Sequence, residues 1–88
     1  MTTIGTTTIE AGVRNGQTLE ITPVRDMLSV VVADAQLGAR MSFVIEPADD
    51  GVWFEYGYDR GQYHAVRSRD NAEALGKIRA LLRGWAHI

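Results

Sequence analysis

The sequence contains no cysteine. This absence excludes disulfide bonds, thiol nucleophiles and cysteine-ligated zinc sites. Because small secreted domains often depend on disulfides, it also favours a reducing compartment. No apolar run approaches the roughly 20 residues of a membrane span, and the first residues lack the basic and apolar segments of a signal peptide. We therefore expect a cytoplasmic protein without a membrane partner.

Residues with catalytic or metal-binding chemistry are also sparse. The two histidines are not spaced with acidic residues as in a zinc motif. Asp49 and Asp50 precede Gly51 in a turn-like stretch, whereas a calcium loop needs about six regularly spaced oxygen ligands. Acid–base chemistry would have to start from His64, which we expect to lie opposite Tyr56. We expect no metal, no cofactor and no catalytic residue, and keep a small oligomeric enzyme using His64 and Tyr56 as an alternative.

Charge is distributed unevenly along the chain, although the net charge is only -2. Residues 1–59 contain three arginines and nine acidic residues, whereas residues 60–88 contain six basic and two acidic residues. The basic C-terminal part meets an acidic protein or phosphates, or it complements the chain's own acidic sheet, or both charged faces are simply solvated. A net-acidic chain argues against non-specific nucleic-acid binding, which normally needs a basic domain.

The order of the predicted elements indicates the fold class. With 88 residues, the chain is expected to form a single domain, 1–88, with a modest core. Several β-branched or alternating segments are separated by turn-like residues and followed by a helical pattern. This order predicts an α+β domain: an antiparallel meander of 4–6 strands with one C-terminal amphipathic helix packed on one face. The clearest strands are residues 27–34, 40–46, 51–59 and 62–67.

The C-terminal segment has the pattern of an amphipathic helix over residues 71–85. Asp70 and Glu73 have the spacing of a helix cap. Behind them an apolar stripe repeats every three or four residues: Ala74, Leu75, Ile78, Leu81, Leu82 and Trp85. On the other side Gly76, Ala80 and Gly84 lie four residues apart. This line is either a site of close helix pairing in a homodimer or a set of tolerated small residues, with Gly84 ending the helix.

The N-terminal third leaves its strand register open. Asn15-Gly16 is a strong signal for a two-residue hairpin turn. Such a turn would place Ile9 and Val13 on the opposite face from Leu19 and Ile21. A bulge near residues 11–12 is the favoured solution. The alternatives are a wider turn, or residues 1–8 as a loose arm or edge strand.

The stretch 51–64 holds five of the seven aromatic residues. Gly61 fits the left-handed position of a three-residue hairpin loop. That loop sets Trp53 opposite Arg67 and Gly57 opposite Tyr63, so that the glycine makes room for a ring. One face, expected to carry the helix, then holds Val52, Phe54, Tyr56, Tyr58, His64 and Val66. The other holds Trp53, Glu55, Tyr63 and Arg67.

The second face is the candidate partner-binding surface. Exposed tryptophan, tyrosine and arginine together have the composition of an interface hot spot, and a cation–π contact between Trp53 and Arg67 would contribute about 0.5–1 kcal/mol. Alternatively, Trp53 is covered by the N-terminal arm or by a neighbouring strand. The predicted binding residues are Trp53, Glu55, Tyr63, Arg67 and Arg69.

Two functions follow from these patterns. The first is a non-catalytic protein-binding module, such as a small inhibitor, immunity protein or adaptor, whose partner is another protein. The second is a structural or assembly subunit of the phage or secretion type that self-associates.

Overall fold

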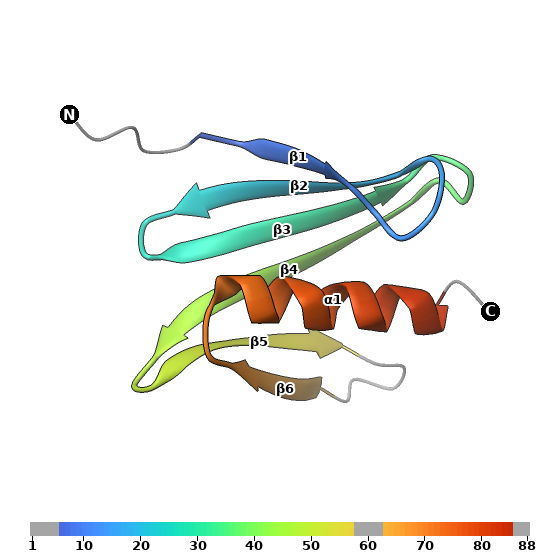
Figure 1. The fold of residues 1–88 in the computed structure, drawn as a ribbon. Helices are drawn as coiled ribbons and strands as arrows, with labels where there is room; N and C mark the ends of the chain where they lie inside the picture. Colours follow the sequence, from blue (N-terminus) through green and yellow to red (C-terminus); the bar gives the residue numbers. More distant parts are fainter. Residues whose placement is uncertain (1–5, 58–62, 86–88) are drawn as a thin grey trace.

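Six strands and one helix follow one another along the chain. The computed structural model describes residues 6–57 and 63–85. The strands form one antiparallel sheet in sequential order, and the helix lies over one face (Figure 1). This arrangement confirms the predicted α+β meander. The elements are β1 (Thr8–Ala11), β2 (Gln17–Val24), β3 (Met27–Asp34), β4 (Ala39–Ala48), β5 (Gly51–Gly57), β6 (Tyr63–Ser68) and α1 (Asn71–Trp85).

The core lies between α1 and the face of the sheet that α1 covers. Alternate residues of each strand point to this face, as the period of two requires. Phe43 and Phe54 meet edge to face at its centre, with their ring centroids 5.8 Å apart. The buried apolar side chains are Leu19, Ile21, Val30, Val32, Phe43, Ile45 and Phe54 from the sheet, and Ala74, Ile78 and Leu82 from α1. The side chain of Trp85, predicted to continue the stripe, lies outside the described part.

Strand β4 changes partners along its length. Its residues 39–45 pair with β3, whereas Glu46–Ala48 pair with Gly51–Trp53 of β5. Beyond the pair Glu46–Trp53 no further ladder pairs join β4 to β5, and Figure 1 shows the two strands diverging from their turn. The sheet therefore opens between its N-terminal and C-terminal halves.

The helix begins where the sequence predicts. The Asp70 carboxylate accepts a hydrogen bond from the amide of Glu73, as an N-cap does. The Glu73 carboxylate reaches back to the amide of Arg69 rather than to that of Asp70. These two hydrogen bonds satisfy the amides of Arg69 and Glu73, where the chain passes from β6 into α1. The start of a helix otherwise leaves amide groups without a partner.

Two basic side chains of α1 reach opposite edges of the sheet. Arg79 donates to the carbonyl of Ala11 and pairs with Glu10 of β1, both at 2.7 Å. Lys77 donates to the carbonyl of Arg67 on β6. Edge strands carry unpaired backbone groups that invite association with other chains. Each of these two side chains donates a hydrogen bond to a backbone carbonyl of an edge strand. Together the two contacts hold α1 across the sheet.

The N-terminal hairpin has a wider turn than the favoured prediction, and the predicted bulge near residues 11–12 is wrong. The pairing of β1 with β2 continues without interruption from the pair Thr8–Ile21 to the pair Ala11–Thr18. The amide of Gly12 then donates a hydrogen bond to the carbonyl of Gln17. The loop therefore spans residues 13–16. In this register Ile9 faces outward and is 68% exposed, while Glu10 shares the covered face with Leu19. Residues 1–5 of the predicted arm lie outside the described part.

The line of small residues on α1 faces solvent. Gly76, Ala80 and Gly84 are all exposed, and a Cβ added at Gly76 would meet nothing within 4 Å. We expect Gly76→Ala to raise the free energy of unfolding by about 0.5–1 kcal/mol, because alanine has the higher helix propensity and fits without contact. Urea denaturation measures this change. A loss of stability that depends on protein concentration would instead support helix pairing in a homodimer.

Candidate functional site

The face of the sheet opposite α1 is not covered by any described element. We call it the outer face. Its apolar side chains include Ile9, Val24, Val44 and Tyr63, each at least 42% exposed. These four side chains come from four different strands, and exposed apolar side chains that are scattered singly are normal on protein surfaces. Of the predicted partner-binding residues, Trp53, Glu55, Tyr63 and Arg67 lie at the β5–β6 end of this face.

The register of the β5–β6 hairpin agrees with the sequence prediction. Trp53 lies opposite Arg67, Glu55 opposite Ala65 and Gly57 opposite Tyr63. The Tyr63 ring lies over Gly57, where an added Cβ would come within 3.4 Å of it. The ring itself is 71% exposed. The loop predicted between Tyr58 and Gln62 lies outside the described residues.

Trp53 and Arg67 line an open hollow of about 350 Å³ on the outer face. Ala48, Asp49 and Ala65 complete its lining. Trp53 is half-buried, so neither the N-terminal strand nor a neighbour seals it. The expected cation–π contact between Trp53 and Arg67 is not formed. Because the guanidinium is not stacked on the indole, both groups border the hollow separately.

A second hollow, of about 310 Å³, lies beside the first, where β4 and β5 diverge. Glu46 of β4 and Glu55 of β5 contribute carboxylates, and the exposed Tyr63 borders it. The remaining lining residues are Ser42, Val44, Tyr56 and Gly57. Alternation in residues 40–46 places Glu46 on the outer face, but nothing in the sequence indicates that β4 and β5 part there. Glu46 is therefore a site residue that sequence analysis missed.

Arg69 is not brought into either hollow. Its guanidinium pairs with the Glu73 carboxylate at 2.9 Å, at the start of α1. Hydrogen bonds from the backbone and side chain of Arg69 hold the pKa of Glu73 below its usual value. Four of the predicted binding residues thus share the outer face: Trp53, Glu55, Tyr63 and Arg67. Arg69 instead binds the Glu73 carboxylate at the start of α1.

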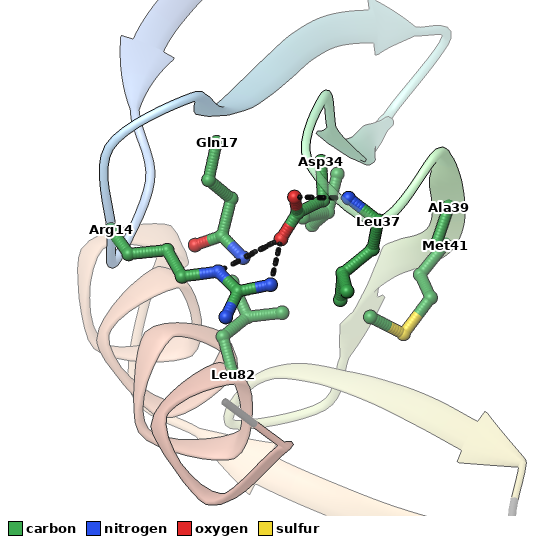
Figure 2. A pocket seen from close by; sticks show the side chains of 8 residues that line it. Arg14, Gln17, Asp34, Leu37, Ala39, Met41 and Leu82 are labelled. Atoms are coloured by element: carbon green, nitrogen blue, oxygen red, sulfur yellow. Dashed lines mark hydrogen bonds and ion pairs between the residues drawn. The ribbon is translucent and has the colours of Figure 1, made fainter. Parts of the chain in front are cut away.

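A polar cluster at the opposite end of the sheet was not predicted from the sequence (Figure 2). The buried Asp34 carboxylate receives hydrogen bonds from Arg14 Nε and Nη2 at 3.0 and 2.6 Å. Its other oxygen accepts from the amides of Gln36 and Leu37. Gln17 contributes a longer contact of 3.5 Å. The cluster joins the loop of residues 13–16 to the turn that follows β3.

The size of the adjoining cavity indicates that this cluster is structural. Its volume is about 40 Å³, and its walls include Val32, Met41 and Leu82. Small-molecule sites usually occupy roughly 300–1,000 Å³, whereas a few water molecules fill a space of this size. The Asp34 carboxylate already accepts several hydrogen bonds, so its acceptor sites are largely used.

Stability should depend on the ionisation of Asp34. The hydrogen bond from Arg14, followed by smaller contributions, holds the pKa of Asp34 below its usual value. A lowered pKa stabilises the folded state above the unfolded-state value, about 3.9, and this contribution is lost as pH falls through the folded-state pKa. We expect Asp34→Asn to lower the urea midpoint at pH 7, and the gap to wild type to close at acidic pH. Glu20→Gln, at an exposed site on β2, is the control; a gap of equal size at every pH would contradict the prediction.

The hypothesis of acid–base chemistry at His64 needs a cleft beside the imidazole, and none of the hollows described for residues 6–57 and 63–85 provides one. The imidazole stacks on Tyr56, with the ring centroids 5.3 Å apart, and His64 is exposed. None of the three hollows described above includes His64 in its lining. Within residues 6–57 and 63–85, no group of three or more histidine, aspartate or glutamate side chains is arranged to hold a metal ion. No helix in this part of the chain is long and apolar enough to cross a membrane.

Comparisons with protein-family models, curated proteins and solved structures found no match.

Proposed function

We propose that the chain is a non-catalytic protein-binding domain, a small inhibitor, immunity protein or adaptor acting in the cytoplasm through its outer face. The observation that carries this proposal is the placement of Trp53, Tyr63 and Arg67 on the face that α1 leaves open. Tryptophan, tyrosine and arginine dominate the binding energy of many interfaces. In a standard interface each partner buries about 800 Å² of its surface. The molecule measures 42 × 28 × 20 Å, so the outer face is large enough for such an interface.

Removing the two side chains of the first hollow tests this proposal. We expect a Trp53→Ala, Arg67→Ala double variant to bind the native partner at least 30-fold more weakly, because loss of one hot spot alone costs about 2 kcal/mol or more. The partner is first captured from the protein's own cells by the wild-type chain, and affinities are then measured with purified components.

The matched control is Arg83→Ala, which removes an exposed arginine from α1. Circular dichroism and a urea titration establish that all variants remain folded. Undiminished affinity of the folded double variant would refute the proposed surface, as would an equal loss in the control.

A structural or assembly subunit is the second candidate. It is favoured by the exposed line Gly76, Ala80 and Gly84, on which a second helix backbone can approach closely. Light scattering over a range of concentrations distinguishes the two candidates, because an assembly subunit must show a concentration-dependent rise in mass.

A further inference from the structure

Strand β1 forms the edge of the sheet that lies farthest from β6, and one contact fixes the direction of its backbone groups (Figure 1). The amide of Gly12 donates to the carbonyl of Gln17, the residue opposite it in the register of β1 and β2. Opposite residues of an antiparallel pair alternate between those that exchange hydrogen bonds and those that do not. Counting back from Gly12, Glu10 therefore bonds to β2, whereas Ile9 and Ala11 direct their amides and carbonyls away from it.

The outward backbone groups of β1 are available for a further strand. Arg79 donates to the Ala11 carbonyl at 2.7 Å, as expected for a carbonyl that β2 does not use. No hydrogen bond among residues 6–57 and 63–85 uses the amide or the carbonyl of Ile9. The Ile9 side chain, on the outer face, is 68% exposed. Unpaired backbone groups beside an exposed apolar side chain favour the addition of another strand.

Strand β1 also lacks the features that usually keep an edge strand from pairing, such as lysines, prolines and bulges. Residues 6–11 contain no lysine or proline, and the pairing with β2 is uninterrupted. The one charged side chain in this stretch, Glu10, is paired with Arg79 at 2.7 Å. The edge strand β6 differs, because it carries the charged Arg67, whose carbonyl accepts a hydrogen bond from Lys77.

The free edge of β1 is complementary to itself about a two-fold axis at Ile9. If β1 strands from two copies paired antiparallel, the two Ile9 residues would exchange both hydrogen bonds, and Ala11 would lie opposite Thr7. The two isoleucine side chains would then meet on the outer face, as in a stabilising cross-strand pair. Glu10 would lie opposite Thr8, and its charge is already paired, so no uncompensated like charges would face one another.

We infer that two copies of the chain join through antiparallel pairing of their β1 strands, which extends the sheet across a two-fold axis at Ile9. Two-fold dimers are the commonest oligomers, because one self-complementary patch serves both copies. A strand pair of this length buries less area than a standard interface, so the dimer is weak and its population follows protein concentration. The inference goes beyond the proposed function, because this edge does not include Trp53 or Arg67.

Amide exchange in the isotopically labelled protein tests the pairing directly. In the monomer the Ile9 amide faces solvent, whereas the Glu10 amide bonds to β2. In the dimer both amides are bonded. Over about a hundredfold rise in protein concentration, exchange at Ile9 should slow severalfold, and exchange at Glu10 should change much less. An exchange rate at Ile9 that stays constant over this range would overturn the inference.

Two variants at position 9 should remove the dimer for different reasons. Ile9→Pro deletes the outward amide without removing a bond to β2, and proline is tolerated on edge strands. Ile9→Glu keeps the amide but places two carboxylates opposite one another, beside Glu20 of β2. Sedimentation equilibrium should show the wild type approaching twice the chain mass as its concentration rises, and both variants at the mass of one chain.

The matched control is Val24→Glu, which adds the same charge at an exposed apolar position away from this edge. It should associate as the wild type does. Circular dichroism and urea titrations at low concentration establish that the variants are folded. A wild-type chain that remains monomeric, or a folded Ile9→Pro variant that still dimerises, would contradict the pairing.

The outcome is separable from that of the proposed function. Ile9→Pro should retain the native partner, because the partner surface lies at the other end of the strand order. A two-fold dimer ends at two copies, whereas association through Gly76, Ala80 and Gly84 would persist in Ile9→Pro. Light scattering on this variant therefore distinguishes the two candidate functions even when the wild type dimerises.

Discussion

Replacing Phe54 with alanine should remove a large part of the free energy of unfolding. Phe54 is fully buried and contacts Phe43 at the centre of the core. Truncation of a buried phenylalanine costs about 3–5 kcal/mol, since the apolar contacts are lost and a cavity remains. A domain of this kind has only roughly 5–15 kcal/mol in total. We expect the variant to be partly unfolded without denaturant, with a strongly lowered urea midpoint.

A neighbouring apolar residue provides the control. Val44 follows Phe43 in β4 and points to the outer face, where it is exposed. Val44→Ala should change the free energy of unfolding by less than about 0.5 kcal/mol, as is usual for surface positions. A large loss at Val44 together with a small loss at Phe54 would mean that α1 covers the opposite face of the sheet.

Gly51→Ala should destabilise the fold even though alanine ordinarily replaces a strand glycine at a gain. A Cβ at this position would lie 2.2 Å from the carbonyl oxygen of Ser68 and 3.2 Å from the Cα of Arg69. Both contacts are with backbone, so no side-chain rotation can relieve them. We expect a loss of about 1–3 kcal/mol, the usual cost of overpacking. The first turn of α1 should become less protected from amide exchange, because the clash displaces the segment that enters it.

The opposite result is expected for Gly76→Ala, which has no atom within 4 Å of its added Cβ. Comparing the two glycines in one set of urea titrations removes the common effect of alanine on the unfolded chain. If both substitutions stabilise the protein, the close approach of Gly51 to the Ser68–Arg69 backbone does not exist in solution.

The β5–β6 hairpin and α1 could be predicted because their determinants are local. The three-residue loop expected around Gly61 predicts the register of Trp53 and Arg67, and β5 and β6 have that register. The cap at Asp70 and the apolar stripe fix the start and the buried side of the helix. Each of these signals lies within a few residues of the structure that it specifies.

The N-terminal loop and the second hollow could not be predicted, because their determinants are distant. The wider turn at residues 13–16 is held by Arg14, whose partner Asp34 lies at the end of β3. The hollow at Glu46 depends on β4 leaving β5 to pair only with β3. Neither periodicity nor turn propensity reports a contact between distant segments, so Glu46 was not assigned to the site.

The central claim, that the outer face of the sheet binds another protein, is tested most directly by photo-cross-linking in the native cell. A photoreactive phenylalanine analogue replaces Tyr63 in one strain and Arg83 of α1 in another, two exposed positions on opposite sides of the molecule. Position 63 should give a discrete adduct with a different protein, and position 83 should give none. Adducts from position 83 alone, or adducts from position 63 that contain only a second copy of this chain, would contradict the claim.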